Sequence, residues 1–249
     1  MSLLRLENVS RKFGSLVALD QISLEVAAGE LSAVIGPNGA GKTTLFNLIS
    51  GFVPATTGEI WFDGQPINRL SAPDRVALGL VRTFQITEIF PELTVSENVR
   101  IGVEAEAGCS GSPWPNRRRT GEIRARVQEL LDQTGLSSQS SRTVNELAHG
   151  DQRVVEVAMA LSRRPKLLML DEPTAGMGEE ETDRMVELIR HLHTRQGVSI
   201  LFIEHDMDLV FGIAQRITVF NYGKVLAAGA PVDVAANPLV QAAYLGGPQ

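Results

Sequence analysis

The chain has 249 residues, of which 43% are apolar and 21% are charged, and its formal net charge is −6. This composition is typical of a folded globular protein and excludes collagen-like, disulfide-scaffold and disordered chains. The acidic balance argues against a general nucleic-acid binder, and the single cysteine, Cys109, excludes an intrachain disulfide and a cysteine-based metal site.

The N-terminal third predicts strands first and a helix between later strands. Residues 1–30 alternate apolar and polar positions, as antiparallel strands do. The apolar run 31–35 predicts a buried strand, and residues 44–50 carry leucine and isoleucine at helical spacing. Residues 59–62 predict one more short strand, which the following Asp-Gly pair ends.

The middle of the chain changes to helical character. Between about 85 and 161 apolar residues recur at helical spacing. Residues 104–122 are rich in Gly, Ser and Pro and have no period, so they predict a surface loop. This part of the chain is therefore a predicted helical insert.

The C-terminal third alternates buried strands with helices. Short apolar runs at 167–170 and 199–203 predict buried strands, and 185–192 predicts a helix between them. Residues 217–220 and 224–227 flank an Asn-Tyr-Gly turn and predict a hairpin. Buried strands that alternate with helices imply a parallel sheet, so the predicted fold class is α/β.

Residues 36–43, Gly-Pro-Asn-Gly-Ala-Gly-Lys-Thr, match the phosphate-loop pattern G-x-x-x-x-G-K-[ST] at every position, between a predicted strand and a predicted helix. Its glycines let backbone N–H groups turn toward phosphate oxygens, and the helix adds its positive end. Lys42 is predicted to bind the β- and γ-phosphates, Thr43 a Mg²⁺ ion and Thr44 the α-phosphate. The predicted nucleotide-binding residues here are Gly36, Pro37, Asn38, Gly39, Ala40, Gly41, Lys42, Thr43 and Thr44.

Two acids follow the apolar run 167–170. Asp171 can hold Mg²⁺ through water. Adjacent residues of a strand point to opposite sides, so Glu172 is expected to face away from Asp171, placed to polarise or deprotonate an attacking water. Alone the pair would be taken as the cap of a strand, but beside a complete phosphate loop it predicts nucleotide hydrolysis.

A series of motifs spans nearly the whole chain. They are Phe13, the phosphate loop 36–43, Phe84-Gln85, Leu-Ala-His-Gly-Asp-Gln-Arg at 147–153, 167–173 and Glu-His-Asp at 204–206. In this order they resemble the ATP-binding subunits of ABC transporters. The resemblance implies a P-loop NTPase core with a mixed sheet, an N-terminal antiparallel β subdomain and an inserted α-helical subdomain. We therefore expect one domain, with 1–84 and 162–249 as its core and 85–161 as the helical subdomain.

The resemblance also implies a role for each motif. ATP would lie between the phosphate loop of one subunit and the signature segment 147–153 of a second. Phe13 would stack on adenine, although a core aromatic between two strands is the alternative, and Gln85 would reach Mg²⁺ and the water and couple the site to the membrane subunit. The implied catalytic residues are Glu172, His205, Gln85 and Lys42, the Mg²⁺ ligands are Thr43, Gln85 and Asp171, and the nucleotide-binding signature residues are Leu147, Ala148, His149, Gly150, Asp151 and Gln152.

Three positions depart from the family's usual pattern. Ala148 replaces a serine whose hydroxyl binds the γ-phosphate, His149 replaces a glycine, and Gly178 replaces an aspartate. Losing the hydroxyl is expected to weaken the closed state by ~1 kcal/mol. Gly150 is kept, so its backbone N–H remains available to the phosphate. These departures and the C-terminal Ala-Tyr-Leu-Gly, 243–246, are similar to Liv-type importer subunits for branched-chain amino acids and to urea-type relatives. The run Arg-Thr-Phe-Gln at 82–85 is similar too, and the resemblance implies that a helix starts there.

The function implied is an ATPase that powers an ABC importer for branched-chain or other hydrophobic amino acids. A urea or amide importer ATPase and a non-transport regulatory ATP-binding module are the alternatives. ATP and Mg²⁺ are the expected cofactors. The expected partners are a second ATP-binding subunit, identical or different, multi-span permease subunits and, indirectly, a solute-binding protein, but no nucleic acid. No apolar run reaches the ~18 residues of a membrane span, so any membrane role is expected to come through a partner. The resemblance implies a peripheral location at the cytoplasmic face of the inner (plasma) membrane.

Overall fold

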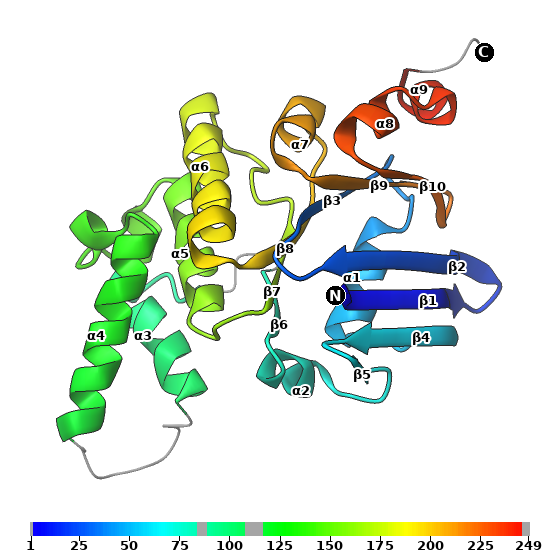
Figure 1. The fold of residues 1–249 in the computed structure, drawn as a ribbon. Coiled ribbons are helices and arrows are strands. Elements are labelled where there is room, and N and C mark those ends of the chain that lie inside the picture. The colour runs from blue at the N-terminus through cyan, green and yellow to red at the C-terminus, as the bar shows by residue number, and fades with distance from the viewer. Residues whose placement is uncertain (1, 84–88, 108–116, 246–249) are drawn as a thin grey trace.

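The computed structural model describes residues 2–83, 89–107 and 117–245. Its strands form two sheets (Figure 1). The first is antiparallel and runs in the order β2-β1-β4-β5, with β1 (Ser2–Phe13), β2 (Leu16–Ala27), β4 (Thr57–Phe62) and β5 (Gln65–Pro66). The second runs in the order β10-β9-β3-β8-β7-β6, with β3 (Leu31–Ile35), β6 (Leu80–Arg82), β7 (Leu167–Asp171), β8 (Ser199–Ile203), β9 (Arg216–Asn221) and β10 (Lys224–Gly229).

The antiparallel sheet forms because its strands alternate apolar and polar side chains, so that one face is buried. β1 pairs with both β2 and β4. The apolar face shares a core with α1 (Lys42–Ser50), in which Phe46 is fully buried. The same core includes side chains of β3, β7 and β8, so α1 packs against both sheets.

The second sheet is mixed. β6, β7, β8, β3 and β9 are parallel, and β10 pairs antiparallel with β9. β7 is buried on both faces, with Leu167 and Met169 in the core around α1 and Leu168 and Leu170 in a second core. Such a continuous apolar run is what a parallel strand with both faces covered requires.

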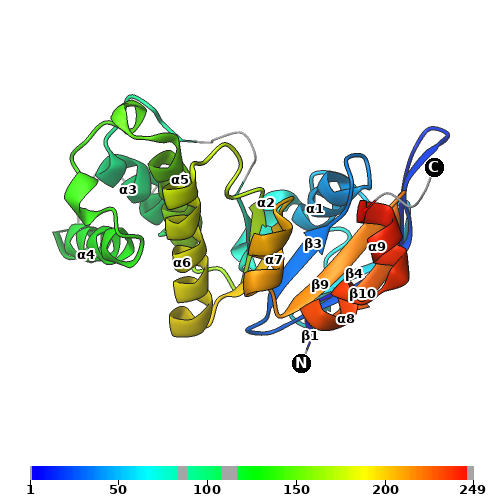
Figure 2. The ribbon, with the colours of Figure 1, turned by 90° about the horizontal axis from the view of Figure 1, so that it is seen from above.

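The second core joins the sheet to a group of helices. These are α3 (Val95–Glu106), α4 (Arg117–Gln133), α5 (His149–Leu161) and α6 (Glu179–Gln196), with two 3-10 turns, Ser137–Gln139 and Val144–Glu146. Figures 1 and 2 both place α3 and α4 at the end of the molecule away from the antiparallel sheet, with α5 and α6 between them and the sheets. We call α3, α4 and α5 the helical lobe.

The α/β prediction and the mixed sheet are confirmed, and so are the predicted strands at 31–35, 167–170 and 199–203. The expected helix start at 82–85 is wrong at its first residue, because Arg82 ends β6 and pairs with Met169 of β7. Sequence patterns missed four short helices, α2 (Ala72–Ala77), α7 (Met207–Ile213), α8 (Pro231–Ala235) and α9 (Pro238–Leu245).

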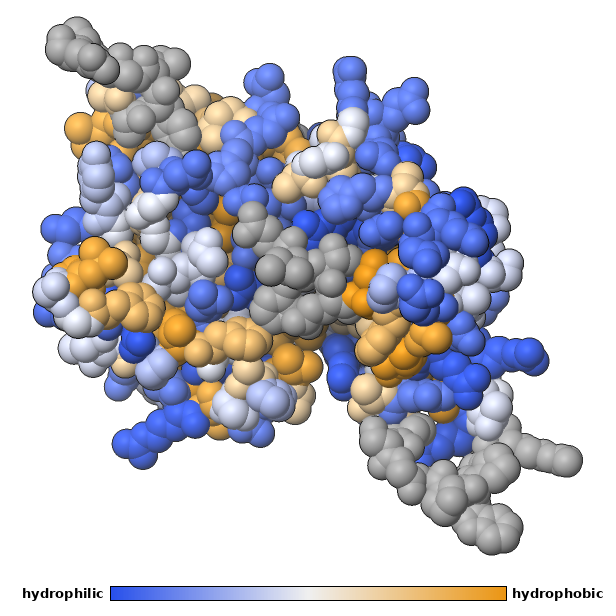
Figure 3. Space-filling view, turned by 180° about the vertical axis from the view of Figure 1, so that it is seen from behind, coloured by the Kyte–Doolittle hydropathy of each residue, from blue (hydrophilic) through white to orange (hydrophobic). Residues whose placement is uncertain are grey.

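The surface is mixed in polarity. Figure 3 shows polar and apolar side chains interspersed on the face behind that of Figure 1. Large apolar side chains that reach the surface include Phe13, Leu16, Phe52, Phe90 and Tyr222. Among the described residues, no helix combines the length and the apolar character that a membrane crossing requires.

Candidate functional site

The phosphate loop connects β3 to α1. Its backbone is tied to the turn between β9 and β10, because the Gly223 N–H donates to the Ala40 carbonyl (3.0 Å). That turn is itself bound to β2, because the Asp20 N–H donates to the Gly223 carbonyl (2.8 Å). Gly41 has a φ of 104°, and a Cβ there would lie 2.9 Å from the Ala18 carbonyl oxygen. A larger residue at this position would meet both backbone strain and the neighbouring strand.

Lys42 is the first residue of α1 and its side chain is buried. Its ammonium Nζ donates to the carbonyls of Gly36 (2.6 Å) and Pro37 (3.1 Å), so it folds back onto its own loop. Burial lowers the pKa of Lys42, and the nearby carboxylates of Glu172 and Asp171 act in the opposite direction. The loop therefore holds a partly desolvated cation at its centre.

An open cavity of about 440 Å³ lies over this loop. Its described lining includes Phe13, Glu172 and His205, so the structure brings these three predicted site residues together with loop residues 38–44. Gly36, Pro37 and Asp171 do not line it, and Gln85 lies outside the described residues.

Phe13 ends β1 and 45% of its surface is exposed, which excludes the alternative of a core aromatic between strands. The guanidinium of Arg11 lies 4.3 Å from the centroid of the Phe13 ring. Leu16 and Tyr222 also line the cavity and are more exposed than Phe13. Sequence patterns missed these two, since each lies in or beside a turn that looks like any other hairpin turn.

Asp171 is the last residue of β7 and is almost completely buried. Its Oδ2 accepts from Nη2 of Arg82 at 2.6 Å, and Nη1 of Arg82 donates to Oδ1 of Asn47 at 2.7 Å. This ion pair links the ends of β6 and β7 to α1. Sequence reasoning missed Arg82 because it stands 89 positions before its partner.

Glu172 does not continue the strand, so the expectation that it alternates with Asp171 is wrong. Its φ is +50°, a left-handed conformation that is uncommon outside glycine. Its backbone N–H donates to the Ile203 carbonyl at 3.0 Å, and its carboxylate Oε1 lies 2.8 Å from Nε2 of His205. The turn after β7, rather than the pleat of the strand, directs this carboxylate toward the cavity.

His205 follows β8 and its side chain is 45% exposed. The preceding Glu204 is buried, and its carboxylate accepts from the His205 N–H (3.0 Å) and from the N–H (2.9 Å) and hydroxyl (2.6 Å) of Thr174. Glu204 therefore ties the loop after β8 to the loop after β7. Glu204 thus supports the position of His205. It is part of the motif 204–206, but no feature of the sequence predicted this supporting role.

The signature segment lies at the start of α5 in the helical lobe. Leu147 and Gly150 are buried, whereas Ala148 and His149 are exposed, and Ala148 is an N-cap without a side-chain hydrogen bond. Gln152 donates to the Leu147 carbonyl at 3.1 Å, and Asp151 accepts from Gln139 at 3.0 Å. None of 147–152 lines the cavity over the phosphate loop. The two halves of the predicted site are therefore on separate surfaces of one chain.

Comparisons with protein-family models and with known proteins point to the same family. The ABC transporter family model matches residues 19–175, and a model described as branched-chain amino acid ATP-binding cassette transporter matches residues 224–248. The high-affinity branched-chain amino acid transport ATP-binding protein LivG of Salmonella typhimurium is 40% identical over 250 residues, which cover 98% of each chain.

Two solved structures are also similar. The ADP conformation of MJ1267, an ATP-binding cassette of an ABC transporter, matches with a TM-score of 0.86 and 31% identity, over 99% of this chain and 100% of that one. A dimeric post-hydrolysis state of the ATP-binding cassette MJ0796, bound to ADP and Pi, matches with a TM-score of 0.76 and 25% identity, over 92% of this chain and 98% of that one.

Members of this family bind nucleotide and act with membrane permeases, so both properties are implied for this chain. The described fold, a P-loop core with an antiparallel sheet and a helical lobe, is that of the matched cassettes. The chain belongs to the ABC transporter family and is one of its ATP-hydrolysing, ATP-binding cassettes.

Proposed function

We propose that the chain powers an importer for branched-chain amino acids, at the cytoplasmic face of the inner (plasma) membrane. Similarity to LivG over 98% of both chains, which extends through the C-terminal match at 224–248, carries the proposal. We further propose that 1–84 and 162–249 form the ATPase core and 85–161 the helical subdomain. The partners are multi-span permease subunits, a second cassette and, indirectly, a solute-binding protein.

The cavity over the phosphate loop supports the way ATP would be held. Phe13 and Tyr222 offer exposed aromatic side chains for the adenine, and the N-terminus of α1, which lines the cavity, would face the phosphates. Lys42 would exchange its two carbonyl acceptors for phosphate oxygens. The donor set fits Mg²⁺, a hard cation, since Thr43 is an exposed residue that can offer its hydroxyl and Asp171 retains an oxygen beyond the one that Arg82 binds. Bound with ATP, Mg²⁺ would offset phosphate charge.

Hydrolysis would proceed by in-line attack of a water on the γ-phosphate. Glu172 would accept the proton from this water, and His205, 2.8 Å from the Glu172 carboxylate, would donate toward the γ-phosphate. Gln85 would complete the water and Mg²⁺ contacts. A second cassette would add its Leu147, Ala148, His149, Gly150, Asp151 and Gln152, because these residues lie outside the cavity of their own chain.

The proposal is tested by recovering the complex from membranes. We would tag Glu172→Gln, which should keep ATP bound, express it in the native host, solubilise the membranes and identify what co-purifies. Multi-span permeases together with a second cassette would support it, and reconstituted uptake of leucine would test the substrate. Recovery with no membrane protein would overturn the importer, and uptake of urea instead of leucine would overturn the substrate.

Replacing Lys42 is expected to weaken nucleotide binding without lowering the stability of the fold at neutral pH. Because the pKa of Lys42 is lowered on folding, the unfolded chain binds the proton more tightly, and the buried charge reduces stability at neutral pH. This loss begins to be relieved as the pH rises past the lowered pKa and is gone above the ordinary pKa of lysine. Lys42→Met is therefore expected to leave the melting temperature without nucleotide undiminished at pH 7, and the wild type should gain on the variant at alkaline pH.

The same variant is expected to weaken ATP binding by about 10- to 100-fold, since hydrogen bonds to a charged group contribute ~1.5–3 kcal/mol. Melting curves with and without ATP at pH 7 to 10 check both effects. Lys12→Met, on the exposed end of β1, is the matched control. Normal ATP-induced stabilisation of Lys42→Met would contradict the role of Lys42.

Restoring the missing hydroxyl tests the signature segment. Ala148→Ser is expected to strengthen ATP-dependent association with a second cassette by ~1 kcal/mol, about fivefold, because it supplies a donor that Ala148 lacks. A serine at this position is also a better N-cap for α5, so the melting temperature should rise slightly. Analytical ultracentrifugation with ATP measures the association, and a weaker association would contradict the assignment.

A further inference from the structure

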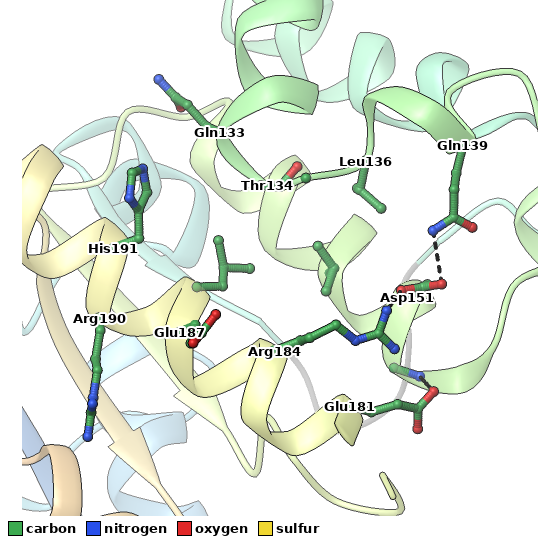
Figure 4. A pocket seen from close by; sticks show the side chains of 14 residues that line it. Gln133, Thr134, Leu136, Gln139, Asp151, Glu181, Arg184, Glu187, Arg190 and His191 are labelled. Atoms are coloured by element: carbon green, nitrogen blue, oxygen red, sulfur yellow. Dashed lines mark hydrogen bonds and ion pairs between the residues drawn. The ribbon is translucent and has the colours of Figure 1, made fainter. Parts of the chain in front are cut away.

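The first turns of α5 and α6 share one carboxylate. Oε1 of Glu181 accepts from the backbone N–H of Gly150 at 3.3 Å (Figure 4). Oε2 of Glu181 accepts from the backbone N–H of Gly178, also at 3.3 Å. Glu181 therefore connects the signature segment of the helical lobe with the loop that leads into α6. Both N–H groups belong to helix starts, where intrahelical acceptors are lacking.

Gly150 and Glu181 are in close contact. A Cβ on Gly150 would lie 2.9 Å from Cδ and 3.0 Å from Cβ of Glu181, and Gly150 is buried. The neighbouring His149 has its ring against Gly176, since a Cβ there would lie 3.6 Å from the imidazole Cδ2. The start of α5 and the loop 174–178 thus form one continuous surface.

In the proposed complex, two anions would compete for the backbone N–H of Gly150. A helix N-terminus favours negative charge, and Glu181 provides it within the chain. In the proposed complex, the γ-phosphate on a second cassette would approach this same helix start. Ala148 has no hydroxyl with which to share the phosphate, so the backbone N–H of Gly150 carries more of the contact. A carboxylate kept beside an arriving phosphate would repel it.

Glu181 has a second partner within reach. Arg184 lies three residues further along α6, on the same helix face, and its guanidinium Nη1 is 3.6 Å from Oδ1 of Asp151. Glu181, Arg184 and Asp151 line an open cavity of about 610 Å³ between α6 and the helical lobe (Figure 4). The exposed guanidinium of Arg184 can therefore donate to the Glu181 carboxylate when that carboxylate no longer binds the Gly150 N–H.

We propose that Glu181 is a positioning residue. In the nucleotide-free chain its carboxylate accepts from the Gly150 N–H, and it moves to the guanidinium of Arg184 when the nucleotide of a second cassette arrives. The release of the Glu181 carboxylate from Gly150 sets the ATP concentration at which two cassettes associate. This role rests on the proposed function, because it needs a nucleotide that a second cassette presents to α5.

The test uses Glu172→Gln as the parent, since this variant is expected to hold ATP without turnover. Glu181→Gln on this parent is expected to lower the ATP concentration for half-maximal association by about fivefold or more, because the repelling charge is gone. Arg184→Gln is expected to raise it, because the carboxylate loses its second partner. Glu180→Gln is the matched control, with the same charge change in the same turn of α6. Association is measured by analytical ultracentrifugation with increasing ATP, with the second cassette added if one co-purifies.

The results of these measurements distinguish a positioning role of Glu181 from a merely structural one and from failure of the proposed cassette pair. Opposite shifts for Glu181→Gln and Arg184→Gln, with unchanged affinity for a fluorescent ATP analogue, support the positioning role, because a merely structural loss would weaken association in both. Equal behaviour of Glu181→Gln and Glu180→Gln, or weaker association of Glu181→Gln, overturns the role of Glu181 and leaves the proposed function intact. A parent that does not associate at any ATP concentration overturns the proposed cassette pair, and this role with it.

Discussion

Glu172→Gln is expected to lower the rate of ATP hydrolysis by about 10²- to 10⁴-fold, the usual contribution of a general base. The amide has nearly the same shape as the carboxylate but does not accept the proton of the attacking water. The turn after β7 points the side chain into the cavity, where Oε1 lies 2.8 Å from His205. A steady-state phosphate-release assay on the purified protein measures the effect.

ATP binding should survive this change. Glu172 is one of the two carboxylates whose charge acts on Lys42, and removing a negative charge beside the phosphate site lowers repulsion of ATP. Titration with a fluorescent ATP analogue should therefore give equal or tighter affinity. Glu179→Gln, an exposed carboxylate on α6, is the control for loss of charge alone. Unchanged turnover in Glu172→Gln would contradict its assignment as the base.

The largest expected loss of stability follows from Arg82. Arg82→Met leaves Asp171 buried without its cation, and breaking a buried pair in this way typically costs ~3–5 kcal/mol of unfolding free energy. Only 5% of the Arg82 side chain and 4% of the Asp171 side chain are exposed, so water cannot replace the lost partner. The variant also loses the hydrogen bond to Asn47 and the contact of the guanidinium with the Phe46 ring.

Urea unfolding measures this loss, and two controls sharpen it. The double variant Arg82→Met, Asp171→Asn removes the unpaired charge and should recover part of the stability. Lys166→Met breaks an ion pair with Asp63 that is about half exposed, and should cost less than ~1 kcal/mol. Equal losses from Arg82→Met and Lys166→Met would show that the buried pair contributes no more than a surface pair.

The residues changed in these two variants, Glu172 and Arg82, differ in how well the sequence predicted their roles. Glu172 stands next to Asp171 at the end of an apolar run, so its residue type and neighbourhood predicted its importance. Its left-handed backbone did not follow from that pattern, because the conformation depends on the hydrogen bond to Ile203 on the neighbouring strand. The roles of Glu172 and His205 stay predictions until turnover is measured.

The sequence by itself determined the α/β class, the phosphate loop with its flanking strand and helix, and the buried strands 31–35, 167–170 and 199–203. These follow from local patterns of apolar residues, glycine and lysine, which act within a few positions. It missed α2, whose six residues are too few to show a helical period, although Ser71 and Asp74 cap it.

The tertiary structure alone decided which distant groups meet. Arg82 reaches Asp171, Glu204 binds Thr174, and Glu181 binds Gly150, across 89, 30 and 31 positions of the chain. Each contact forms where parallel strands end at one edge of the sheet or where two helices begin side by side. No local pattern encodes such a meeting, because it depends on the order of the strands and on the packing of α5 against α6.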